Sequence, residues 1–206
     1  MIKLHHLNQS RSLRILWLLE ELNQPYELVS YKRNKDNHLA PENLKQVHPL
    51  GKSPVIELDG KVIAESGAIT ELLIEKFAPE RLMPKADTPE YAEYLQWIHF
   101  AESSLMVPLL LDIFTQAAGV DDNKFLKNYI ASEKGKLLSY LDQTLENKSY
   151  IVGDQLSGAD FMLAFNFIML NKNQQLENYP NIKKYIGKLA ELESFQRAMK
   201  IEEQNN

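Results

Sequence analysis

One stretch of the chain carries the clearest structural signals: Gly51-Lys52-Ser53-Pro54-Val55-Ile56-Glu57-Leu58-Asp59-Gly60-Lys61-Val62-Ile63-Ala64-Glu65-Ser66. Two strand-like runs flank the dipeptide Asp59-Gly60, which supplies the positive φ angles that a tight hairpin turn requires. Pro54 cannot donate a main-chain hydrogen bond, so it suits the entry to a strand, where a cis Ser53-Pro54 bond is compatible with the bend. Such a bend leaves the main chain of Val55 facing a groove, where a peptide-like ligand can pair as an added strand does.

The residues on either side of this hairpin predict the other elements of one α/β unit. Residues 2–7 and 26–31 are typical of strands, and the apolar residues of segment 10–22 recur mainly at helical spacing. A strand, helix and strand in this order almost always cross over right-handed, with the strands parallel. A short helix over 41–47, the hairpin over 54–64 and a helix over 66–77 complete the order βαβαββα.

After residue 77 the composition changes and strand signals nearly vanish. The proline-bearing segment 79–88 is typical of a linker. We therefore expect an α/β domain over 1–78 and an all-helical domain over 89–206. The expected helices cover about 89–117, 123–146, 158–171, 180–191 and 193–200, and Pro108 is expected to kink or split the first of them.

The helical domain contains one strong helix-start signal, Ser157-Gly158-Ala159-Asp160. A serine followed three positions later by an acidic residue fits the capping box. The helix that it begins is apolar nearly all round, which is typical of a helix at the centre of a bundle. We interpret Ser157 and Asp160 as folding determinants rather than catalysts.

Composition excludes several classes of function. The chain has no cysteine, so any thiol chemistry must use a thiol that the substrate brings. The formal charge is -5 without a basic stripe, which argues against nucleic-acid binding. His5 and His6 alternate across a strand and cannot readily share one metal, and no other cluster has metal-ligand spacing. Because neither an export signal nor an apolar run of about 20 residues is visible, we expect a cytoplasmic protein with no membrane segment.

The order of these features resembles the glutathione transferases over essentially the whole chain. Residues 8–22 and 47–55 are similar to the corresponding segments of the serine-type bacterial and fungal members, and Tyr179-Pro180-Asn181-Ile182 and Phe195-Gln196-Arg197 are similar to that family's closing segment. The resemblance implies a thioredoxin-like domain that holds glutathione, a helical domain that forms the pocket for an electrophile, and a homodimer. Glutathione is then a co-substrate, and no bound cofactor is implied.

The implied reaction needs the glutathione thiol as a thiolate, although a free thiol has a pKa of about 8.5. A hydroxyl that donates a hydrogen bond to the sulfur near the positive end of a helix stabilises the anion. Ser10, at the expected start of the first helix, is the first candidate, although serine also suits a simple helix cap there. Ser12 is the alternative and Asn8 a third candidate. A tyrosine-type mechanism does not fit, because the first tyrosine, Tyr26, lies in the second strand.

The hairpin supplies candidate contacts to the rest of glutathione. Ser53, Pro54 and Val55 are assigned to its peptide-like middle. Glu65 and Ser66 lie where a strand enters a helix, and a helix start favours a bound carboxylate. We assign the γ-glutamyl carboxylate to Ser66 and the γ-glutamyl ammonium group to Glu65.

Two further sets of contacts follow from the same resemblance. Lys52 is the candidate partner of the glycine carboxylate of glutathione, with His38 and Lys45 as alternatives. The electrophile pocket is expected along the first long helix of the helical domain, although most residues of such an aromatic stripe are expected to be core. The residues concerned are Trp97, Phe100, Ala101, Ser104, Leu105 and Pro108.

We therefore expect a detoxifying glutathione S-transferase that conjugates the glutathione thiolate to small electrophilic, hydrophobic compounds. One alternative is a glutathione-dependent peroxidase or isomerase, in which the same thiolate attacks a peroxide or a double bond. The other is a non-catalytic module of the same fold that binds glutathione or a protein partner. The intact set Ser10, Ser53-Pro54-Val55 and Glu65-Ser66 argues against the non-catalytic module, because a scaffold does not need the peptide site.

Overall fold

The computed structural model describes residues 1–120 and 122–205 and divides into two compact units. The first unit comprises Met1–Met83 and the segment from Lys188 onward, and the second comprises Pro84–Gly187. A four-stranded mixed sheet with helices is followed by a helical domain, so the predicted fold class is confirmed. The sequence placed everything after residue 88 in the helical domain. The last helix, α8 (Glu193–Gln204), instead groups with the first unit because it packs along α1 (Ser12–Leu22).

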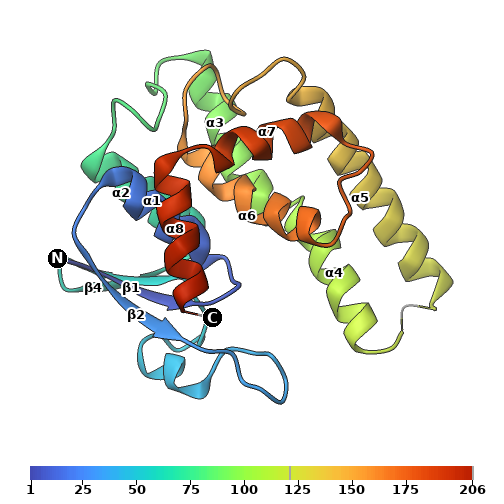
Figure 1. The fold of residues 1–206 in the computed structure, drawn as a ribbon, viewed down its shortest axis with the longest axis horizontal. Coiled ribbons are helices and arrows are strands. Elements are labelled where there is room, and N and C mark those ends of the chain that lie inside the picture. The colour runs from blue at the N-terminus through green and yellow to red at the C-terminus, as the bar shows by residue number, and fades with distance from the viewer. Residues whose placement is uncertain (121, 206) are drawn as a thin grey trace. The chain divides into compact units, whose positions relative to one another are not determined.

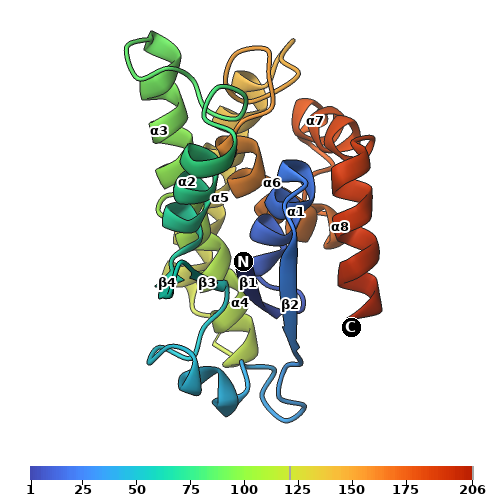
Figure 2. The same ribbon diagram turned by 90° about the vertical axis from the view of Figure 1, so that its left-hand side faces the viewer.

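The sheet of the first unit has the strand order β2-β1-β3-β4 (Figure 2). The strands are β1 (Ile2–Leu7), β2 (Tyr26–Tyr31), β3 (Val55–Leu58) and β4 (Lys61–Ala64). As predicted, β1 pairs in parallel with β2, and β3 and β4 form an antiparallel hairpin. β3 also pairs antiparallel with β1, which makes β1 an inner strand, and all of its residues except Lys3 are buried.

The predicted turn chemistry of the hairpin is present. Asp59 has a φ of 52° and Gly60 a φ of 77°, the pair of positive angles that a tight two-residue turn needs. The Ser53-Pro54 peptide bond is cis, the isomer with which the bend before the strand is compatible. The turn therefore returns the chain as β4, which leads directly into α2 (Ser66–Phe77).

The first unit also contains the helices α1, α2 and α8 and a short 3-10 turn, η1 (Glu42–Gln46). α1 packs on β1, α2 packs on β3 and β4, and α1 and α2 contact each other. α8 runs alongside α1 (Figures 1 and 2). The Trp17 Nε1–H donates to Ser194 Oγ at 3.1 Å, and the Trp17 ring packs edge-on against Phe195 with centroids 5.1 Å apart. These contacts fix the C-terminal helix next to the residues that follow β1.

The second unit is helical. It contains α3 (Pro89–Glu102), α4 (Met106–Ala117), α5 (Lys124–Thr144), α6 (Gly158–Lys172) and most of α7 (Pro180–Ala190). The first predicted helix is thus two helices, and the break at 103–105 lies just before Pro108. This proline falls in the first turn of α4, where its missing N–H costs no intrahelical hydrogen bond.

α6 has the central position that its apolar sequence predicts. Most of its residues are buried, and it packs against α3. Ser157 and Asp160 form the predicted capping box at its start. Both residues therefore have the structural role that the sequence analysis gave them.

The stretch Pro89–Ala117 is long and apolar enough to count as a candidate membrane span by length and composition. Core helices of soluble proteins pass the same test, so this is weak evidence. In the structure the break at 103–105 divides the stretch, and its first part, α3, packs against α6.

Candidate functional site

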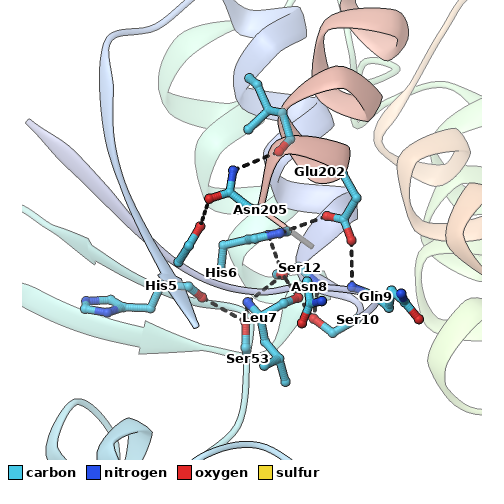
Figure 3. Close-up of polar contacts among 12 residues, drawn as sticks. His5, His6, Leu7, Asn8, Gln9, Ser10, Ser12, Ser53, Glu202 and Asn205 are labelled. Carbon is cyan, nitrogen blue, oxygen red and sulfur yellow. Dashed lines mark hydrogen bonds and ion pairs between the residues drawn. The ribbon is translucent and has the colours of Figure 1, made fainter. Parts of the chain in front are cut away.

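Three serines predicted for the site lie around one main-chain atom, the amide nitrogen of Leu7 at the end of β1 (Figure 3). The Leu7 N–H is shared between Ser53 Oγ at 3.1 Å and Ser12 Oγ at 3.2 Å. Ser53 Oγ donates to the His5 carbonyl oxygen at 2.8 Å, and Ser10 Oγ lies 3.0 Å from Ser12 Oγ. The fold therefore brings together the turn after β1, the start of α1 and the loop before β3.

The two candidate catalytic serines differ in how their hydroxyls are used. Ser12 has no exposed surface, and its Oγ also contacts His6 Nδ1 at 2.7 Å and the Leu7 carbonyl oxygen at 3.0 Å. Its one proton and two lone pairs are thus engaged inside the protein. Ser10 is 7% exposed, and its Oγ accepts the Ser12 N–H at 3.1 Å beside Ser12 Oγ. This geometry favours Ser10 as the hydroxyl that can donate to a ligand.

The turn that carries Ser10 is held by two other elements. Gln9 has a φ of 50°, which a residue other than glycine rarely adopts. The Gln9 N–H donates to Glu202 Oε1 of α8 at 2.6 Å, and the Gln9 carbonyl accepts from Arg33 Nη2 at 2.7 Å. Arg33 Nε donates to the carbonyl of Asn8 at 3.2 Å. These contacts fix the direction in which the turn presents Ser10.

The loop before β3 offers main-chain hydrogen-bonding groups at Ser53 rather than at Val55. Val55 lies inside the sheet, in register with His5 on one side and Ala64 on the other, and is buried. The Ser53 N–H and C=O form no hydrogen bond with any residue that the structure describes. The open main chain that was predicted at Val55 therefore lies two residues earlier, because strand pairing begins at Val55.

Glu65 and Ser66 lie at the junction of β4 and α2. Glu65 is exposed and has a φ of 71°, and strained backbone of this kind is common at ligand clamps. Ser66 is buried, and its Oγ accepts from Nη1 of Arg14 at 3.1 Å. Arg14 is only 1% exposed, so a buried cation lies beside the first residue of α2, where the helix dipole also favours an anion. The junction is chemically suited to a carboxylate at Ser66 and an ammonium group at Glu65.

The candidates for the glycine carboxylate are all surface residues. Lys52 and His38 are exposed. Lys45 is also exposed and forms an ion pair with Glu42 at 2.7 Å. The assignment of Lys52 therefore stays a prediction.

The residues predicted for the electrophile pocket are largely core of the second unit. Trp97, Ala101 and Leu105 are buried, and the Trp97 ring stacks on Tyr140 with centroids 5.5 Å apart. An open cavity of about 620 Å³ in this unit is instead lined by α4, α5 and residues after α6, including Asp112 and Gln175.

Three charged residues of the first unit were not singled out from the sequence. Arg14 had a local signal, because it interrupts the apolar residues of the first helix. Arg33 and Glu202 contact Gln9 from 24 and 193 residues away in the sequence. No local pattern marks either of them, so only the fold reveals their role.

Two family descriptions match the chain. "Glutathione S-transferase, N-terminal domain" matches residues 1–75, and "Glutathione S-transferase, C-terminal domain" matches residues 109–200. The chain is similar to Glutathione S-transferase 3 of Schizosaccharomyces pombe, with 34% identity over 199 residues. That match covers 90% of this chain and 81% of the relative.

Solved structures share the fold. A glutathione S-transferase from Actinobacillus pleuropneumoniae has a TM-score of 0.88 and 36% identity, covering 98% of this chain and 93% of that one. A sphingomonad glutathione S-transferase complexed with glutathione has a TM-score of 0.80 and 24% identity, covering 97% of this chain and 98% of that one. At that identity the second likeness shows the fold alone, and the bound glutathione is a property of that protein.

Proposed function

The chain belongs to the glutathione S-transferase family, and we propose that within it the chain is a serine-type enzyme that conjugates glutathione to small electrophilic, hydrophobic compounds. The thiol proton leaves to solvent, and the thiolate sulfur forms a bond to the electrophilic carbon. The leaving group, where there is one, departs with the bonding electrons. In an addition to a double bond, the displaced electron pair takes up a proton from solvent instead. Glutathione is a co-substrate, and the reaction needs no bound cofactor.

The hydroxyl of Ser10 supplies the nucleophile in this proposal. Its oxygen accepts the Ser12 N–H at the start of α1, which leaves its proton available for a sulfur anion. A hydrogen bond to the charged form of a group favours that form, and so does the nearby helix N-terminus. The observation that carries the proposal is this hydroxyl, linked through Ser12 and the Leu7 N–H to Ser53, whose main-chain groups are unpaired within the described residues.

Glutathione is held in this proposal by groups that match its parts. The main chain of Ser53 pairs with the cysteinyl residue as an added strand does. Ser66, with Arg14 behind it, receives the γ-glutamyl carboxylate, and Glu65 receives the ammonium group. Holding both reactants in one orientation removes much of the entropic cost of a bimolecular step.

Two other functions use the same bound thiolate. In a peroxidase the sulfur attacks a peroxide oxygen, and a second glutathione completes the reduction. In an isomerase it adds to a double bond and leaves again. A non-catalytic module would bind glutathione without turning over any electrophile.

Calorimetric titration with glutathione, followed by product analysis, tests the proposal. We expect binding, a thiolate ultraviolet absorbance near neutral pH, and conjugates with a chloronitrobenzene. Faster reduction of organic hydroperoxides or faster isomerisation would transfer the assignment to the first alternative. Binding with no product from a broad panel would favour the module, and no binding would refute the proposal.

Replacing Glu65 by glutamine is expected to weaken glutathione binding about five- to tenfold, since a partly exposed charge-assisted hydrogen bond is lost. The substitution keeps the size of the side chain, and the pKa of the bound thiol should not change, because Glu65 is assigned to the other end of the ligand. Calorimetry measures the affinity. Glu75→Gln on the exposed face of α2 is the control. Equal affinities for the two variants would remove Glu65 from the site.

The homodimer and the cytoplasmic location belong to the same proposal, because both follow from the family resemblance and composition. Sedimentation velocity of the purified chain measures the assembly. A single species at the mass of one chain, 23.8 kDa, would contradict the dimer.

A further inference from the structure

A continuous row of buried polar atoms connects the C-terminal helix to Ser10 (Figure 3). Glu202 Oε2 lies 2.8 Å from His6 Nε2, and His6 Nδ1 lies 2.7 Å from Ser12 Oγ. Ser12 Oγ in turn lies 3.0 Å from Ser10 Oγ. His6 is fully buried and Glu202 is 5% exposed. The row thus joins three elements of one unit, α8, β1 and the start of α1.

The hydrogen bonds of the Ser12 hydroxyl determine the direction in which the Ser10 hydroxyl donates its hydrogen bond. Ser12 has one proton and two lone pairs, and one lone pair receives the Leu7 N–H that it shares with Ser53. When His6 Nδ1 is bare, Ser12 donates to it and keeps a lone pair that attracts the Ser10 proton inward. When Nδ1 carries a proton, the second lone pair of Ser12 Oγ accepts a hydrogen bond from this N–H. Ser10 then has no inward acceptor on Ser12, and its proton is free to point toward a ligand.

Glu202 favours the second arrangement. A carboxylate can only accept, so a proton on Nε2 is the arrangement that suits it, in a contact that is close but poorly aligned for a hydrogen bond. A carboxylate this deeply buried is costly without a cation close to it. An imidazolium ring at His6 would supply that cation, and it would carry a proton on Nδ1 as well. Arg33 is another charged group near Glu202: burial lowers the pKa of Arg33, and the Glu202 carboxylate opposes that shift.

We propose that His6 and Glu202 are positioning residues that turn the Ser10 hydroxyl toward the glutathione sulfur. This inference rests on the proposed function of Ser10. Neither residue touches the ligand in this arrangement. Glu202 contacts the His6 ring and accepts the Gln9 N–H. The ring donates to Ser12 Oγ, so the Ser10 hydroxyl donates outward to the sulfur.

A pair of variants separates this role from helix docking. In Glu202→Gln, the amide oxygen accepts the Gln9 N–H and the amide NH₂ faces His6 Nε2, which leaves the proton of the neutral ring on Nδ1. This conservative variant should keep the low pKa of the bound thiol. In the double variant His6→Leu/Glu202→Gln, no ring N–H donates to Ser12 Oγ, so its second lone pair can accept the Ser10 hydroxyl. The bound thiol pKa should then rise by about one unit, the equivalent of one ordinary hydrogen bond, and kcat should fall up to tenfold near neutral pH. The KM for glutathione should change little.

Ser194→Ala is the structural control, because it removes the hydrogen bond from Trp17 that also docks α8 on α1. It should leave the thiol pKa unchanged even if α8 is loosened. The thiolate absorbance of the glutathione-saturated enzymes, titrated against pH, measures all three variants. An equal thiol pKa in the single and double Glu202 variants would overturn the inference while leaving the proposed function intact. A wild-type enzyme without any thiolate absorbance would instead refute the proposed function.

The wild-type chain provides a second test that does not depend on how the variants fold. Nitrogen-15 NMR distinguishes a protonated from a bare imidazole nitrogen, and His6 can be assigned through its contacts with Ser12. We expect Nδ1 of His6 to be protonated when the enzyme is saturated with glutathione near neutral pH. A bare Nδ1 would overturn the inference.

Discussion

Replacing Ser10 by alanine is expected to raise the pKa of the enzyme-bound glutathione thiol by about one to two units, because a hydrogen bond to a charged group contributes about 1.5–3 kcal/mol. A raised thiol pKa reduces the thiolate fraction about tenfold per unit at any pH below both values. Turnover should therefore fall about ten- to hundredfold near neutral pH and recover once the pH exceeds the new thiol pKa. Glutathione affinity should stay within about threefold, since Ser53, Glu65 and Ser66 are unchanged.

Thiolate absorbance and kcat, both titrated against pH, measure this effect, and Ser12→Ala is the matched comparison. Ser12 is fully buried and serves the Leu7 N–H and His6 Nδ1, so its loss should lower the free energy of unfolding by about 1–3 kcal/mol. The bound thiol should keep its low pKa in this variant. The reverse pattern would make Ser12 the catalytic hydroxyl. Unchanged thiol pKa values in both variants would exclude both serines from the mechanism.

Most of the fold was predictable because its signals are local. The Asp59-Gly60 turn, the 3.6-residue periodicity of the helices and the capping box at Ser157 each act within a few residues of the chain. The split of segment 89–117 was also predictable, because proline is disfavoured inside a helix. The grouping of the last helix with the first unit was not, because it depends on tertiary contacts such as the packing of Phe195 on Trp17.

The candidate site was predictable in part for the same reason. Ser10 and Ser53 follow from turn and helix-start patterns, and both lie near the end of β1 in the fold. The open main chain was assigned to Val55 instead of Ser53, because the residue at which strand pairing begins is not encoded in a short motif. The role of Glu202 could not be predicted from the sequence, because its partner Gln9 lies 193 residues away along the chain.

Replacing Asp160 by alanine is expected to lower the free energy of unfolding by about 4 kcal/mol, because several buried donors lose one shared acceptor at about 1–3 kcal/mol each. Its carboxylate accepts from the Ser157 N–H at 2.8 Å, the Ser157 hydroxyl at 3.0 Å, the Ile151 N–H at 3.0 Å and the Tyr185 hydroxyl at 2.6 Å. Burial raises the pKa of Asp160, and these four donors oppose that rise. Alanine removes all four contacts from the helical unit at once.

Urea denaturation followed by circular dichroism measures this loss, and Asp142→Ala provides the matched control. Asp142 also accepts from the start of a helix, through the Ile182 N–H at 3.0 Å and Asn181 Nδ2 at 3.1 Å. It is only half-buried, so water can replace the lost acceptor and the expected cost is about 1 kcal/mol. Equal losses of unfolding free energy in the two variants would mean that the burial of Asp160 does not increase the stability that the capping box contributes. The central position of α6 would then depend on its apolar side chains alone.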